Sequence, residues 1–85
     1  MSQVTMYSTQ RCPFCLMAEQ LLTRKGIDQL TKIRVDSDPN ELDRMITLTG
    51  RRSVPQLFIG ERHVGGYDDL VKLDQAGELD ALLAA

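Results

Sequence analysis

Apolar side chains change their spacing several times along the first half of the chain, and each change predicts a new element. Short extended runs alternate with stretches in which apolar residues recur every three or four positions, as on one face of a helix. Pro13 suits a first helical turn, and Gly26 and Gly50 are good helix ends. The predicted elements are a strand over 4–7, a helix over 14–25, a strand over 31–35 and a helix from Asp38-Pro39 to Gly50.

The second half of the chain shows two short apolar runs and then a helical pattern. Leu57-Phe58-Ile59 predicts a strand, and His63-Val64 predicts its antiparallel partner across a turn. Asp68-Asp69 opens a last helical region that has a break at Gly77. The order strand–helix–strand–helix–strand–strand–helix predicts an α/β fold with a mixed sheet flanked by helices, in a single domain over residues 1–85.

Composition is ordinary for a folded protein, with 42% hydrophobic and 26% charged residues, so a packed core is expected. The formal net charge of −2 gives no basic field for nucleic acid. Apolar runs are too short to span a membrane, and the first residues lack the regions of a signal peptide. We therefore expect a cytoplasmic protein without a membrane partner, in a compartment where a cysteine pair is more often catalytic or metal-binding than structural.

Cys12-Pro13-Phe14-Cys15 places two thiols where the first predicted strand gives way to the first predicted helix. The free N–H groups and partial positive charge of a helix N-terminus favour thiolate over thiol, which lowers the pKa of the leading cysteine. Arg11 adds a cation beside it. Cys12 is therefore the predicted nucleophile of a thiol–disulfide redox site, and Cys15, one turn further and better buried, is the predicted resolving thiol.

Metal binding and plain core packing are the alternatives for a Cys-x-x-Cys pair. A structural zinc ion takes four ligands, and beyond the two thiols this chain offers only His63 and carboxylates. A pair between a strand and a helix is a redox signature. The sequence thus favours redox chemistry without a metal.

Val54-Pro55 stands just before the apolar strand at 57–59. Because proline has no N–H to give to a sheet, it must begin that strand or lie at an edge. A trans bond that only starts the strand and a cis bond that turns the Val54 backbone toward the thiols both fit the sequence.

Several groups of residues share their order and spacing with one family along nearly the whole chain. They are Tyr7, Cys12-Pro13-Phe14-Cys15, Gly50-Arg51, Ser53-Val54-Pro55, Phe58-Ile59 and Gly65-Gly66-Tyr67-Asp68-Asp69-Leu70. In these residues the chain resembles the glutaredoxins, and most closely their small bacterial dithiol type. The resemblance implies a thioredoxin fold, with a four-stranded mixed sheet flanked by helices (βαβ–α–ββα), and a cis peptide at Val54-Pro55. It also implies reduction of protein disulfides and of protein–glutathione mixed disulfides, with glutathione re-reducing the enzyme.

The resemblance further implies glutathione as a co-substrate, no metal, and a glutathione groove carried over position by position. Phe14 would line the groove, and the Val54 backbone beside Pro55 would pair with the cysteinyl part. Gly66-Tyr67-Asp68 would hold the γ-glutamyl part, whose carboxylate suits helix N-terminal N–H groups and whose ammonium suits an Asp side chain. Asp68 also suits the N-cap of the last helix.

The chain departs from the family pattern at two positions. Many members have a lysine three residues before the first cysteine, which helps to hold the glycine carboxylate of glutathione, and this chain has Thr9 there. Arg51 is the best candidate to supply that cation, with Arg52 or Arg11 in reserve. Phe14 keeps the ring of the usual tyrosine and loses its hydroxyl.

Three further residues receive structural roles only. His63 is expected on the strand surface and is not a catalytic base, because a thiolate needs none. Met17 and Met45 fit core packing better than metal binding.

The implied partners are glutathione and disulfide-containing or glutathionylated proteins, with ribonucleotide reductase as one use. The nearest alternative is a redoxin recharged by thioredoxin reductase, which would not turn over with glutathione and glutathione reductase. A second alternative is an iron–sulfur carrier in which two chains share a cluster through Cys12 and glutathione. Pro13 and Cys15 argue against it, because the members best known for that role have one cysteine and a glycine after it. A non-catalytic binding module would not need both cysteines.

Overall fold

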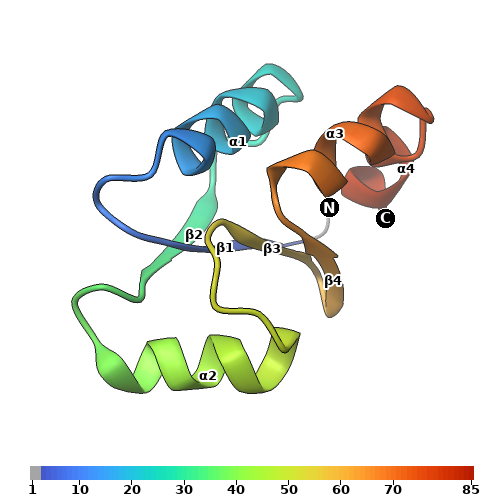
Figure 1. Cartoon of the computed structure of the whole chain (residues 1–85). Helices are drawn as coiled ribbons and strands as arrows, with labels where there is room; N and C mark the ends of the chain where they lie inside the picture. Colours follow the sequence, from blue (N-terminus) through green and yellow to red (C-terminus); the bar gives the residue numbers. More distant parts are fainter. Residues whose placement is uncertain (1–2) are drawn as a thin grey trace.

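The computed structural model describes residues 3–85 and arranges its helices in two layers, one on each side of a single sheet (Figure 1). The predicted order of strands and helices is confirmed, and the last helical region divides into two helices at Gly77, as predicted. In chain order the elements are β1 (Val4–Ser8), α1 (Pro13–Arg24), β2 (Leu30–Arg34), α2 (Pro39–Thr49), β3 (Gln56–Ile59), β4 (Arg62–Gly65), α3 (Tyr67–Gln75) and α4 (Leu79–Ala84).

The sheet has four strands in the order β2-β1-β3-β4. Strands β1 and β2 run parallel, joined by the crossover helix α1, whereas β3 is antiparallel to both β1 and β4. The mixed sheet predicted from the sequence is therefore confirmed. Strand β2 begins and ends one residue before the predicted range, so Val35 lies just beyond the ladder, where its N–H still donates to the Ser8 carbonyl at 2.9 Å.

Alternation along β1 sends side chains to both faces of the sheet, and each face has its own core. Helices α1, α3 and α4 cover one face and α2 covers the other (Figure 1). The smaller core, under α2, consists of Tyr7, Val35 and Met45. The larger core consists of Val4, Met6, Cys15, Ala18, Leu21, Leu22, Ile27, Leu57, Ile59, Leu70, Leu79 and Leu83.

The apolar stripe predicted for α1 is wider than the face that the helix buries. Ala18 and Leu22 lie in the core, but Phe14 is 55% exposed and Met17 is 40% exposed. The prediction that Met17 packs in the core is wrong, because that side of the helix faces solvent near the cysteines. Met45 on α2 is fully buried, as predicted.

The starts of α2 and α3 are capped in different ways. Asp38 caps α2 by accepting from the Asn40 N–H at 3.0 Å, as predicted. Asp68 does not cap α3, which contradicts that prediction: the N-cap is Gly66, and Asp69 Oδ2 accepts from the Gly66 N–H at 2.9 Å. The helix therefore begins before Asp68, at Tyr67.

Membrane insertion of a helix requires about 20 apolar residues. Within residues 3–85, no helix is long and apolar enough to cross a bilayer.

Candidate active site

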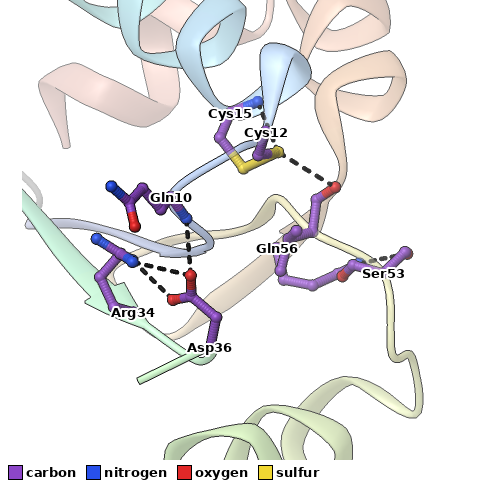
Figure 2. The surroundings of a disulfide bond; sticks show 8 residues. Gln10, Cys12, Cys15, Arg34, Asp36, Ser53 and Gln56 are labelled. Carbon is purple, nitrogen blue, oxygen red and sulfur yellow. Dashed lines mark hydrogen bonds and ion pairs between the residues drawn. A yellow bond between two sulfur atoms is a disulfide. The ribbon is translucent and has the colours of Figure 1, made fainter. Parts of the chain in front are cut away.

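Cys12 and Cys15 form a disulfide at the start of α1, with their Cα atoms 5.2 Å apart (Figure 2). Cys12 is the N-cap residue, with extended backbone, and Cys15 lies in the first turn behind Pro13. Pro13 suits this turn because its missing N–H would have no helical partner there. The structure thus shows the two predicted redox residues in their oxidised form.

The two sulfurs have different surroundings. Cys15 is only 4% exposed and belongs to the larger core, whereas Cys12 is half-buried at its edge. The Cys15 N–H donates to Cys12 Sγ at 3.1 Å. After reduction, the same N–H group and the helix N-terminus would favour the thiolate form of Cys12. This asymmetry agrees with the exposure expected for a nucleophile and a resolving thiol.

The loop before β3 approaches the same sulfur. The Val54-Pro55 peptide bond is cis, which confirms the bond implied by the resemblance. The Val54 carbonyl oxygen lies 3.8 Å from Cys12 Sγ. A peptide lying against this loop would therefore lie within reach of Cys12.

A groove of about 220 Å³ opens at this loop. Its walls come from the start of α1, the loop before β3 and the start of α3, so it joins segments far apart in the sequence. The Phe14 and Tyr67 rings lie beside each other with their centroids 5.9 Å apart. The lining residues are Phe14, Arg51, Ser53, Val54, Pro55, Gln56, Gly66, Tyr67, Asp68 and Asp69, which include every predicted glutathione-binding position.

Of the three candidate arginines, Arg51 lines the groove. Arg11 and Arg52 are exposed and lie outside the lining. The Nη1 atom of Arg51 lies 3.2 Å from Asp69 Oδ2. The Gly66 N–H, and after it the Arg51 guanidinium, hold the pKa of Asp69 below its usual range. Asp69 thus ties the start of α3 to the arginine across the groove.

Sequence reasoning missed three lining residues, Ser53, Gln56 and Asp69. Ser53 and Gln56 directly flank Val54-Pro55, and Asp69 stands three residues after the N-cap, a spacing typical of a capping side chain. A place next to Val54-Pro55, or at the third position of a helix, is the sequence signal that could have identified these three residues. His63 lies on β4 as expected but is half-buried, and its Nε2 atom lies 2.8 Å from Gln56 Oε1.

Thr9 and Gln10 line a different cavity of about 430 Å³, which also reaches Cys12 and Cys15. The Gln10 N–H donates to Asp36 Oδ2 at 3.0 Å, and the Arg34 guanidinium binds both oxygens of Asp36 at 2.7 and 2.8 Å (Figure 2). Arg34, and after it the Gln10 N–H, hold the pKa of Asp36 well below its usual range. These bonds fix the loop that leads into Cys12.

The glutaredoxin family model matches residues 4–64, which contain the disulfide and the cis proline loop. The chain belongs to the glutaredoxin family. Accordingly it is a thiol–disulfide oxidoreductase, and the resemblance drawn from its motifs is confirmed.

Similar glutaredoxins match over almost the whole chain. The glutaredoxin of Neisseria meningitidis serogroup B is 52% identical over 83 residues, which cover 98% of this chain and 98% of that protein. Glutaredoxin 3 of Escherichia coli K12 is 41% identical over 83 residues, which cover 98% of this chain and 99% of that protein. The crystal structure of a buckwheat glutaredoxin–glutathione complex superposes with a TM-score of 0.89 at 26% identity, covering 98% of this chain and 77% of that one. The thioredoxin fold expected from the motifs is therefore confirmed.

Proposed function

We propose that this protein is a glutathione-dependent oxidoreductase that reduces protein disulfides and protein–glutathione mixed disulfides. The observation that supports the proposal is the groove beside the disulfide, which gathers the aromatic, basic and acidic groups that a short anionic peptide requires. A buckwheat glutaredoxin of the same fold has been crystallised with glutathione. Glutathione is accordingly the proposed co-substrate, and no resident metal is proposed.

Each part of glutathione has a matching group in the groove. The γ-glutamyl carboxylate would accept from the N–H groups at the start of α3, and its ammonium would face the exposed Asp68 carboxylate. The cysteinyl part would pair with the Val54 backbone, which brings its sulfur toward Cys12. Arg51 would bind the glycine carboxylate, in place of the lysine that Thr9 replaces. Phe14 and Tyr67 would flank the peptide with their rings.

A glutathionylated protein would be reduced through Cys12 alone. The Cys12 thiolate attacks the glutathione sulfur, the old disulfide breaks, and the protein thiolate leaves and takes a proton from water. A second glutathione thiolate then attacks the bound glutathione sulfur and releases oxidised glutathione. The incoming glutathione sulfur is oxidised from thiol to disulfide as the protein sulfur is reduced from disulfide to thiol, and Cys12 returns to the thiolate form.

A protein disulfide would require both cysteines. The Cys12 thiolate attacks one protein sulfur, the protein disulfide breaks, and the other protein sulfur leaves as a thiolate that takes a proton from water. Cys15, as a thiolate, then attacks Cys12 Sγ and releases the second protein thiol. The enzyme is left with the Cys12–Cys15 disulfide seen in the structure, and two glutathione molecules reduce it. The proposed setting is the cytoplasm, and ribonucleotide reductase is one proposed protein substrate.

The proposal is tested by a coupled assay with a glutathionylated peptide, glutathione, glutathione reductase and NADPH. With wild type, glutathione reductase should oxidise NADPH as it reduces the oxidised glutathione that is released. Cys15→Ser should support at least about half of that rate, because the reaction uses only one enzyme thiol. With a protein disulfide as substrate, Cys15→Ser should lose most activity. Thioredoxin reductase in place of glutathione and glutathione reductase is the matched control. Turnover by wild type only with thioredoxin reductase would overturn the proposal and favour the alternative redoxin.

A further inference from the structure

Gln56 is the first residue of β3, directly after the cis proline, and its side chain is only 1% exposed. Among the described residues 3–85, the buried polar residues are Ser8 and Gln56. A buried amide is unfavourable unless its donor and acceptor atoms are both paired. The partners of Gln56 therefore indicate what the amide does.

The amide nitrogen of Gln56 bonds back to the loop that forms the groove. Nε2 donates to the Ser53 carbonyl at 3.0 Å and approaches the Ser53 hydroxyl at 3.3 Å. Figure 2 shows the Gln56 side chain extending toward Ser53. This bond closes a ring over Val54-Pro55, so the intervening backbone is held at both ends.

The amide oxygen of Gln56 faces His63 on β4, at 2.8 Å from Nε2. Because the Ser53 carbonyl can only accept, the amide nitrogen must face Ser53, and His63 must be the donor to the oxygen. Burial, and after it the charge of Arg51, lowers the pKa of His63, which favours the neutral ring. The contact with Gln56 Oε1 then assigns the ring proton to Nε2. The His63 ring also packs against Phe58, with centroids 5.1 Å apart. His63 thus fixes which way the amide points.

The backbone that the Gln56–Ser53 hydrogen bond holds is the part of the loop nearest to the reactive sulfur. Val54 O lies 3.8 Å from Cys12 Sγ, and Ser53, Val54 and Gln56 all line the groove. Gln56 itself is not an acid or base for the thiol, since both ends of its amide are already paired. Its effect on the reaction must therefore pass through the position of Val54.

We propose that Gln56, oriented by His63, is a positioning residue that holds the Val54 backbone where it pairs with the cysteinyl part of glutathione, and so sets the affinity for glutathionylated substrates. This inference rests on the proposed glutathione-dependent function. The pairing is present in the bound substrate as well as in the transition state, so its loss changes KM rather than kcat.

The decisive variant is Gln56→Met, which keeps the length of the side chain and removes the amide. KM for a glutathionylated peptide should rise about fivefold, as expected for one lost hydrogen bond, while kcat stays within about twofold. The pH profile of kcat should not move, because the Cys15 N–H bond to Cys12 is untouched. Backbone ¹⁵N relaxation in the glutathione-free protein should show increased motion at Val54.

His63→Phe is the second variant, because it keeps ring packing against Phe58 but removes the donor to the amide oxygen. It should raise KM about twofold and decides the question if Gln56→Met does not fold. Ile59→Val is the matched control: it trims a buried side chain at the other end of β3, away from the groove, and should lower Tm without changing KM.

An unchanged KM in Gln56→Met, or a fall in kcat at constant KM, would overturn the positioning role. Val54 relaxation equal to that of wild type would also overturn it. These outcomes are separate from failure of the proposed function, in which wild type itself would show no turnover with glutathione. The relaxation measurement needs no glutathione and tests the bond between Gln56 and the loop in either case.

Discussion

Cys12 and Cys15 are chemically identical residues that the fold makes different. Cys12 is the half-buried N-cap of α1 and lies beside the Val54 carbonyl, and the Cys15 N–H points at its sulfur. Cys15 lies within the helix and packs in a core shared with α3 and α4. This difference in exposure and hydrogen bonding between the two sulfurs supports the proposal that Cys12 attacks the substrate and Cys15 resolves the mixed disulfide.

Cys12→Ser should abolish reduction of both glutathionylated and disulfide substrates, because serine offers no thiolate. Its hydroxyl can still accept from the residue 15 N–H as an N-cap, so α1 should remain stable. The assay is the coupled turnover described above. A Tm close to that of reduced wild type is the control for folding. Measurable residual turnover would contradict the role of Cys12 as the attacking sulfur.

At the scale of elements, the site is an assembly of three segment ends. The start of α1 supplies the sulfurs, the loop before β3 supplies backbone, and the start of α3 supplies N–H groups and carboxylates. Arg51 and Asp69 join the last two across the groove. A ligand carboxylate that binds Arg51 must therefore compete with Asp69 for the guanidinium.

Arg51→Ala should raise KM for a glutathionylated peptide about five- to tenfold and leave kcat within about twofold, because an exposed charged contact contributes to binding and not to sulfur exchange. Arg52→Ala, one residue further and outside the groove lining, is the matched control and should keep the wild-type KM. A mixed disulfide of γ-glutamylcysteine, which lacks the glycine carboxylate, should be used equally well by wild type and Arg51→Ala. If Arg51→Ala leaves KM unchanged, the glycine carboxylate contact must lie elsewhere.

The sequence predicted the strand and helix order because turn and cap residues coincide with the changes of hydrophobic period. Asp38 and Gly50 mark α2, and Gly77 marks the break before α4. It did not predict the exposure of Met17, because spacing reports which residues are apolar and not which side of a helix another layer covers. The sequence also assigned the N-cap of the last helix to Asp68. In the structure the N-cap is Gly66, two residues earlier, which has the extended backbone of a cap.

The candidate site was predicted less completely than the fold. Both cysteines and seven groove positions followed from motifs, and the structure gathers those seven around one groove. The Gln56–His63 bond could not be anticipated, because it depends on the register between β3 and β4 and on burial of the amide. Pairs of this kind require the tertiary structure.

At the scale of the whole molecule, the sheet separates two cores of unequal size. The larger core includes Cys15 of α1 together with residues of α3 and α4, so these three helices share one core. Lys25 at the end of α1 binds Asp74 at 2.6 Å and Asp80 at 3.2 Å, which links α1 to α3 and to α4. The oxidised site is thus one part of a cooperative unit, and its stability can be measured on the whole protein.

Global stability should depend on pH through Asp69. Its folded pKa is lowered, first by the Gly66 N–H and then by Arg51, so its carboxylate stabilises the fold above the unfolded value of about 3.9. That contribution is lost as the pH falls below this value and through the lower folded pKa. Asp69→Asn should therefore have a lower Tm than wild type at pH 7. Between pH 5 and pH 2, its Tm, measured by circular dichroism, should fall less than that of wild type. Asp68→Asn, exposed and one residue earlier, is the matched control. Equal acid sensitivity in wild type and Asp69→Asn would contradict this prediction.

The burial of Cys15 beneath the exposed start of α1 has a practical consequence for chemical labelling. In the reduced protein, a small alkylating reagent meets one accessible sulfur and one that the core shields. A single equivalent should therefore modify Cys12 and leave Cys15 free. The product would be a permanent thioether in the place where a transient partner is normally attached, suited to crystallising or spectroscopically tagging that otherwise short-lived state.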